Sequence, residues 1–273
     1  MDNIELNLFL EVFFMSTKIK FLRELKLKNA ILFTGLPGIG LVGKIVVDYL
    51  LKEIKSEKFG LIYSDSFPPS VHTKDGLIEL ICDELYYFSH NNQDFVFLSG
   101  PVQPSLDYTM ASSKQHYEFA QKIVETSVKL GVKEIYTLAG LNVGDSRIGQ
   151  KPRVVVAATD KKTLEEFTKL GAIINQPEGL ISGAAGLILG EGIDAGLRGA
   201  CLMGETNAKL IYGDPGSAKS LLELLIKKFD FKVKLDRIGK EAKQIEQAFK
   251  QLNTKMQEEM KEENPVEGLT YVR

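Results

Sequence analysis

Short apolar runs rich in β-branched and aromatic residues alternate along the chain with segments whose apolar positions repeat every three or four residues. The runs predict strands at residues 30–34, 59–63, 95–98, 134–138, 153–157, 200–204 and 209–212. The periodic segments predict helices at residues 42–53, 108–130, 163–170 and 179–189. Strands that alternate with helices form a sheet covered on both faces, so the pattern predicts a three-layer α/β/α body with a mixed sheet.

Two further apolar runs depart from this alternation. Residues 77–82 and 85–88 are separated only by Asp83 and Glu84, which leaves too little chain for a crossover helix. These two runs are therefore predicted to pair as an antiparallel hairpin.

From residue 217 the pattern changes to long helices. One helix is predicted at residues 217–228, after the Asp-Pro-Gly-Ser turn that begins at Asp214. A second is predicted at residues 233–261, where apolar residues form a narrow stripe: Leu235, Ile238, Ala242, Ile245, Phe249, Leu252 and Met256. The stripe needs one partner surface, and its spacing leaves open whether that is the chain's own body or another subunit.

These patterns divide the chain into an N-terminal extension at 1–17, an α/β/α domain at 18–216, C-terminal helices at 217–262 and a flexible tail at 263–273. The extension has an apolar stretch but carries acidic residues and lacks a basic leader, so it does not resemble a signal peptide. Met15 offers a second start, and the sequence leaves open whether residues 1–14 come from an alternative start or form a terminal strand of the native chain.

Composition narrows the classes of partner. With 44% hydrophobic residues in 273 positions, the chain can bury a large core. Its 34 Lys and Arg balance 36 Asp and Glu, so we expect no nucleic acid partner. Without a long uninterrupted apolar run, we expect no membrane partner either. Two cysteines lie far apart in apolar runs, which is typical of free thiols in a cytoplasmic protein.

A glycine-rich turn joins the predicted strand at 30–34 to the predicted helix at 42–53. It matches the dinucleotide pattern G-x-G-x-x-G and most of the phosphate-loop pattern. However, Ile45 replaces the hydroxyl residue of a phosphate loop, and Asp65 comes too late for the acidic residue of a dinucleotide site. We therefore predict no cofactor and a structural turn that leaves Lys44 in solvent, built by Gly35, Pro37, Gly38, Gly40 and Gly43.

The sequence shows no recognisable arrangement of nucleophile, histidine and carboxylate residues, so we predict neither a catalytic residue nor a metal site. The three histidines stand outside metal-ligand spacing and are predicted to lie on the surface. The most polar loop, residues 142–147, follows a predicted strand, where α/β proteins place ligands. Its Asn, Gly and Asp residues also suit a turn, so the sequence leaves a small-molecule pocket there open.

Several motifs occur in a fixed order along residues 18–240. They are FTGLPGIGLVGKIVVDYLL, SDSFPPSV followed by Asp75-Gly76, LSGPVQP, TLAGL, GLISGAAGLILGEG and YGDPGSAKSLLELLIKKF. This ordered set resembles the archaeal proteasome assembly chaperone family, relatives of the second subunit of the eukaryotic proteasome assembly chaperone. The resemblance implies a phosphorylase/hydrolase-like body without an established reaction, a homo-oligomer in the form of a tetramer or ring, and binding to proteasome α-subunits or the core particle.

For the best-understood members of that family, the resemblance implies binding to proteasome α-subunits through a C-terminal tail ending hydrophobic-tyrosine-any. Here the tyrosine stands third from the end, in the segment Leu269, Thr270, Tyr271, Val272 and Arg273. One extra residue moves the ring by about 3.3 Å along an extended chain. We expect a non-enzymatic chaperone or adaptor that binds partners through this tail. The alternative is a nucleotide- or nucleoside-binding protein or hydrolase that uses the loops at 35–43 and 142–147.

Overall fold

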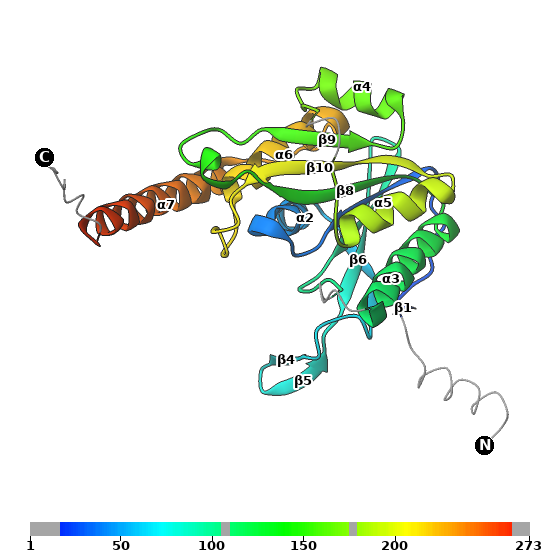
Figure 1. Cartoon of the computed structure of the whole chain (residues 1–273). Coiled ribbons are helices and arrows are strands. Elements are labelled where there is room, and N and C mark those ends of the chain that lie inside the picture. The colour runs from blue at the N-terminus through cyan, green and yellow to red at the C-terminus, as the bar shows by residue number, and fades with distance from the viewer. Residues whose placement is uncertain (1–16, 105–109, 175–178, 264–273) are drawn as a thin grey trace, which may run out of the picture.

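The computed structural model describes residues 17–104, 110–174 and 179–263 of the chain. Eight strands form one mixed sheet in the order β1-β3-β6-β7-β2-β8-β10-β9 (Figure 1). Their bounds are Thr17–Phe21 (β1), Ala30–Gly35 (β2), Glu57–Ser64 (β3), Asp83–His90 (β6), Gln93–Ser99 (β7), Val132–Asn142 (β8), Val154–Ala158 (β9) and Arg198–Thr206 (β10). The central strands β7, β2, β8 and β10 run parallel, and the flanking pairs are antiparallel.

Helices cover both faces of this sheet, which confirms the predicted three-layer architecture. One face carries α2 (Val42–Glu53), α4 (Lys161–Lys169) and α6 (Pro215–Phe229). The other carries α3 (Met110–Lys129) and α5 (Ala184–Asp194). All six residues of β2 are buried, as expected for a central parallel strand with helices on both sides. A last helix, α7 (Asp236–Glu263), lies outside these layers against α6.

An aromatic cluster fills the layer between the sheet and α6. Phe33 of β2 stacks on Tyr136 with ring centroids 5.5 Å apart. Phe229 at the end of α6 meets Phe33 edge-on at 5.2 Å, and Phe231 just beyond it meets Phe95 at 5.0 Å. The segment between α6 and α7 is therefore anchored in the core, which fixes where α7 begins.

The predicted hairpin of residues 77–82 with 85–88 is wrong. Leu77–Leu80 (β5) pairs instead with Val71–Lys74 (β4), whereas β6 joins the main sheet between β3 and β7. The turn explains the difference, because Asp75 and Gly76 both have positive φ, 52° and 80°. Two such residues close a tight two-residue hairpin.

The strand predicted at residues 209–212 is also wrong. Asn207 ends β10 by turning the chain: its side-chain oxygen accepts from the amide of Lys209 at 2.8 Å, and its carbonyl accepts from the amide of Leu210 at 2.9 Å. An Asx turn of this kind competes with strand continuation. The edge strand β1, in contrast, is present without having been predicted.

Two global properties follow from the described residues. None of the helices in that part of the chain is both long enough and apolar enough to cross a membrane.

Both cysteines are free thiols, with Cys201 buried and Cys82 half-buried. Burial raises the pKa of Cys201 to about 11, so its thiol is a poor nucleophile at neutral pH.

Candidate functional site at the base of the C-terminal helix

The glycine-rich turn packs tightly against the carboxyl ends of the parallel strands. It includes a short 3-10 helix, η1 (Ile39–Leu41), ahead of α2. A Cβ atom on Gly43 would lie 2.1 Å from the carbonyl oxygen of Leu138 in β8. Gly40 has φ +61°, and a Cβ there would lie 2.4 Å from the Thr206 hydroxyl. The close approach that these glycines allow is thus to the chain's own strands.

Other residues of the turn are less constrained or differ from expectation. Gly38 has an extended backbone and nothing within 4 Å of an added Cβ. Lys44 does not lie free in solvent, because its ammonium pairs with Asp48 at 2.7 Å and its side chain is 27% exposed. Asp48 also accepts a hydrogen bond from the Ser99 hydroxyl at 2.6 Å. This lysine therefore braces the first turns of α2 against β7.

A buried ion pair joins the two loops that the sequence singles out. The Arg147 guanidinium, at the end of the short helix η2 (Gly144–Arg147), donates twice to Asp214 at 2.9 Å. The two side chains are only 3% and 2% exposed. Bidentate geometry and burial make this the kind of ion pair whose disruption is costly, because each charge left alone would be desolvated.

Asp214 connects three further elements to this pair. Its carboxylate accepts from the Thr206 hydroxyl at the end of β10 and from the Ser217 amide in the first turn of α6, both at 2.9 Å. Its own amide donates to the carbonyl of Gly40 at 2.8 Å. Asp214 is therefore the N-cap of α6, as the Asp-Pro-Gly-Ser turn predicts, and also the point where the glycine turn is held.

Arg147 extends the same network to α7. Its Nη1 and Nη2 atoms lie 3.2 Å from Oε1 of Glu246, whose side chain is 37% exposed. Nη1 also donates to the carbonyl of Gln150 at 3.0 Å. We call Arg147, Asp214 and Glu246 the hub. It fixes α7 to the body ten residues after that helix begins.

The first half of α7 has additional contacts with the body. The Tyr49 hydroxyl donates to the carbonyl of Lys234 at 2.8 Å, and the Arg237 guanidinium lies 4.9 Å from the Tyr49 ring centroid. Ile238 and Ala242 are buried, and Ile238 belongs to the main core. The first half of the apolar stripe thus packs on the chain's own body. The side chains of Leu252 and Met256 lie outside the described ones.

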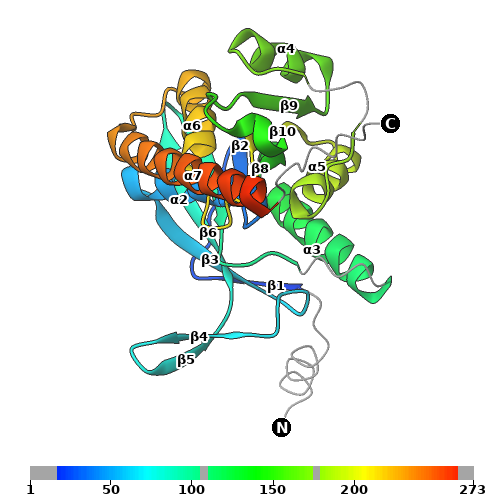
Figure 2. The ribbon, with the colours of Figure 1, turned by 60° about the vertical axis from the view of Figure 1, so that its left-hand side comes forward.

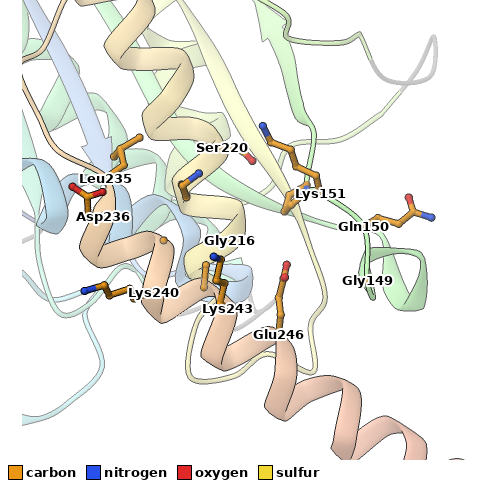
Figure 3. Close-up of a pocket in the computed structure, with 14 residues that line it drawn as sticks. Gly149, Gln150, Lys151, Gly216, Ser220, Leu235, Asp236, Lys240, Lys243 and Glu246 are labelled. Carbon is orange, nitrogen blue, oxygen red and sulfur yellow. The ribbon is translucent and has the colours of Figure 1, made fainter.

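A groove of about 650 Å³ runs beside the hub, between α7, α6 and the loop at 149–152 (Figure 3). Lys240 and Lys243 line the groove from α7, and Lys243 lies next to Glu246. On the opposite wall Lys151 and Lys219 share one carboxylate, that of Glu223, at 3.1 and 2.6 Å. The groove is open and lined by charged groups, which suits contact with a polar protein segment better than enclosure of a small ligand.

The loop at 142–147 and the glycine turn do lie together, but their polar groups bond to each other. Asn142 accepts from the amides of Gly144 and Ala208 at 3.2 and 3.1 Å. Asp145 binds Lys209, whose hydrogen bond lowers the pKa of that carboxyl. The described residues include no group of three His, Cys, Asp or Glu that could hold a metal ion. The internal pairing leaves few groups to recognise a nucleotide.

The remaining sequence predictions have mixed outcomes. The tail residues Leu269 to Arg273 lie outside the described residues. His116 is buried rather than on the surface, whereas His72 is exposed as predicted. The Arg147–Asp214 pair was missed because 67 positions separate its members. The only local signal was Asp214 at a helix start.

The fold and the hub together define the class of protein. It is a three-layer α/β/α body with a C-terminal helix, α7, whose first half is bound to the surface of that body. The chain belongs to the PAC2 family, whose model matches residues 32–253. It is 36% identical to an uncharacterized protein of Methanocaldococcus jannaschii over 236 residues, 86% of each chain.

Two solved structures from Pyrococcus furiosus are similar across almost their whole length. PbaB, described as an archaeal proteasome activator, is 29% identical with a TM-score of 0.78, over 88% of this chain and 100% of PbaB. PbaA, described as an archaeal homolog of proteasome-assembly chaperone, is 25% identical with a TM-score of 0.66, over 93% and 99%. These matches confirm the family resemblance that the ordered motifs indicate.

Proposed function

We propose that this protein is a non-enzymatic, proteasome-associated chaperone or adaptor of the cytoplasm. In this proposal it forms a homo-oligomer and binds proteasome α-subunits, or the assembled core particle, through its C-terminal tail. The observation that carries the proposal is the placement of α7, which is tied to the body by Arg147 at Glu246 and continues to Glu263. At 1.5 Å per residue, these last 17 residues span about 25 Å.

The family and the fold support this choice of partner. PbaB is described as a proteasome activator and PbaA as a homolog of proteasome-assembly chaperone, and both cover most of this chain. A helix rooted in a rigid body places a short tail at a reproducible distance from that body. The direction of α7 is thus set before binding, which reduces the entropy lost when the tail docks.

The tail would dock by the chemistry of its last residues. Its terminal carboxylate suits a basic pocket, and the Tyr271 ring fills an adjacent apolar slot while its hydroxyl keeps a polar partner. Several tails on one oligomer would bind together, so a weak single contact becomes a strong multivalent one. The homo-oligomer and the tail are therefore parts of one mechanism.

A binding series on purified proteasome core particle tests the proposal. We expect Tyr271→Ala and deletion of residues 269–273 each to weaken binding at least about tenfold, while Tyr212→Ala, a control at a tyrosine of the body that is 89% exposed, leaves it unchanged. Deleting Arg273 alone moves the tyrosine to the second position from the end, and we expect this variant to bind at least as tightly as the full chain. Equal binding by the full chain and the 269–273 deletion would remove the tail from the mechanism.

A further inference from the structure

A two-stranded ribbon projects from the body away from the rest of the sheet. Its strands β4 and β5 emerge between β3 and β6 and form a sheet of their own (Figure 1). All eight of their residues are exposed. Figure 1 shows this ribbon and α7 extending from the body at separate places, and in Figure 2 the ribbon again lies apart from α7.

The ribbon has one apolar face and one largely polar face. Directly paired residues of an antiparallel ribbon share a face, and the observed pairs are Val71 with Leu80, His72 with Glu79, Thr73 with Ile78, and Lys74 with Leu77. One face therefore carries three large aliphatic side chains and a threonine: Val71, Thr73, Ile78 and Leu80. The aliphatic three are 51%, 72% and 70% exposed.

An isolated ribbon of this kind is only marginally stable in water. Two-stranded hairpins need a third strand or a packing partner to persist, and among the described residues neither β4 nor β5 pairs with a third strand. The turn at Asp75 and Gly76 fixes the register, so the apolar side chains are presented together rather than dispersed between the faces. A contiguous apolar patch on a projecting element marks an interaction surface.

We propose that the apolar face of this ribbon packs against the same face of a second copy of the chain. This inference rests on the homo-oligomer of the proposed function and assigns the surface that holds it together. A two-fold contact is isologous, so the single apolar face supplies both halves of the interface. The faces that carry His72, Lys74 and Glu79 stay in water on the outside of the resulting two-layer ribbon.

The size and the position of the ribbon favour a second copy over other partners. Its exposed aliphatic side chains present roughly 300 Å² of apolar surface, under half of the roughly 800 Å² that each partner contributes to a stable interface, so they form the apolar centre of a larger contact. Interfaces between identical subunits are more apolar than transient ones, as this face is. Packing here also leaves α7, with its charged groove, clear of the contact (Figure 2).

Substitutions on the two faces of the ribbon form a matched test in the full chain. Ile78→Glu places a charge at the centre of the apolar face, whereas Leu77→Glu places the same charge one position away on the opposite face. The two side chains are 72% and 70% exposed, so neither change disturbs the core. Light scattering coupled to size exclusion over a range of concentrations measures the mass of each variant.

We expect the dissociation constant of the oligomer to rise at least about 100-fold for Ile78→Glu and to stay within about threefold for Leu77→Glu. Under mild oxidation, Thr73→Cys should form a disulfide-linked pair of chains, and His72→Cys should not. A monomeric parent chain, or equal effects of the two glutamates, overturns the assignment.

Core-particle binding of the same variants separates this inference from the proposed function. If Ile78→Glu gives monomers that still bind through the tail with reduced avidity, both stand. If Ile78→Glu keeps its oligomeric mass but no longer binds the core particle, the ribbon contacts the proteasome and the self-packing proposal is wrong. A tail deletion that leaves binding unchanged, together with a mass loss for Ile78→Glu, rejects the tail while supporting the ribbon.

Discussion

The hub makes a quantitative prediction about stability. Replacing Arg147 by methionine keeps most of the side chain's volume but removes the charge that neutralises Asp214. The Asp214 carboxylate, 2% exposed, would retain the Thr206 hydroxyl and the Ser217 amide but lose both guanidinium bonds. Removing one partner of a buried pair costs about 3–5 kcal/mol, because the remaining charge stays desolvated.

The measurement is equilibrium unfolding by guanidinium chloride at a fixed protein concentration, since the proposed oligomer would make apparent stability depend on concentration. For a chain of this size, about 4 kcal/mol corresponds to a melting temperature lower by roughly 8–16 °C. The exposed pair of Arg23 and Glu57, whose side chains are 43% and 63% exposed, provides the control. Arg23→Met should cost less than about 1 kcal/mol.

A second change shows whether the cost arises from the unpaired charge. Asp214→Asn in the Arg147→Met background removes that charge but keeps an N-cap side chain for α6. We expect the double variant to be more stable than Arg147→Met alone, with a coupling energy of about 2 kcal/mol or more. If Arg147→Met costs no more than Arg23→Met, the pair does not stabilise the fold and the reasoning about the hub fails.

Further predictions concern the glycine turn, a buried carboxyl and ligands. Gly43→Ala should destabilise the chain by more than about 2 kcal/mol, whereas Gly38→Ala should stay within about 0.5 kcal/mol in the same unfolding assay, because only the first Cβ meets backbone. Burial raises the pKa of Asp83 well above its usual value, so the folded state holds its proton more tightly than the unfolded state. The free energy of unfolding should therefore fall, by up to about 1.4 kcal/mol per pH unit, as pH rises from about 4 towards the folded-state pKa of Asp83. The Asp83→Asn variant should lack this slope, and melting temperatures measured from pH 4 to 8 test the difference. Nucleotides and nucleosides should leave the melting temperature of the parent chain unchanged, and a specific rise would revive the ligand-binding alternative.

Local chemistry made much of the fold predictable from the sequence. The alternation of apolar runs and periodic segments indicated the central strands and the covering helices, because burial on both faces imposes that pattern. Because Ile45 lacks the hydroxyl of a phosphate loop, the sequence predicted a structural role for the glycine turn. In the structure, Gly43 packs on Leu138. These inferences needed only residues close together in the chain.

The errors arose where the pattern of apolar positions alone does not decide which segments pair. Leu77–Leu80 has the apolar character of a core strand, yet its partner was decided by the two positive-φ residues before it and not by the apolar run after it. Arg147 gave no sign of its partner, because the contact with Asp214 exists only when β8 and β10 lie side by side. Tertiary neighbours of this kind are not encoded in local periodicity.

In the proposed mechanism, the hub and the ribbon have separate tasks: the hub holds α7 for partner binding, and the ribbon joins the subunits. Glu246 ties α7 to a buried pair that also holds the glycine turn and the start of α6, so the direction of α7 is fixed relative to the sheet. The ribbon, in contrast, forms a sheet of its own and lies between β3 and β6 in the chain. Glu246→Ala should therefore reduce binding to the core particle by loosening α7, without changing the oligomeric mass. Ile78→Glu should change the mass and affect binding only through avidity. Loss of mass on Glu246→Ala would mean that α7 itself joins the subunits, and the separation of tasks would then be wrong.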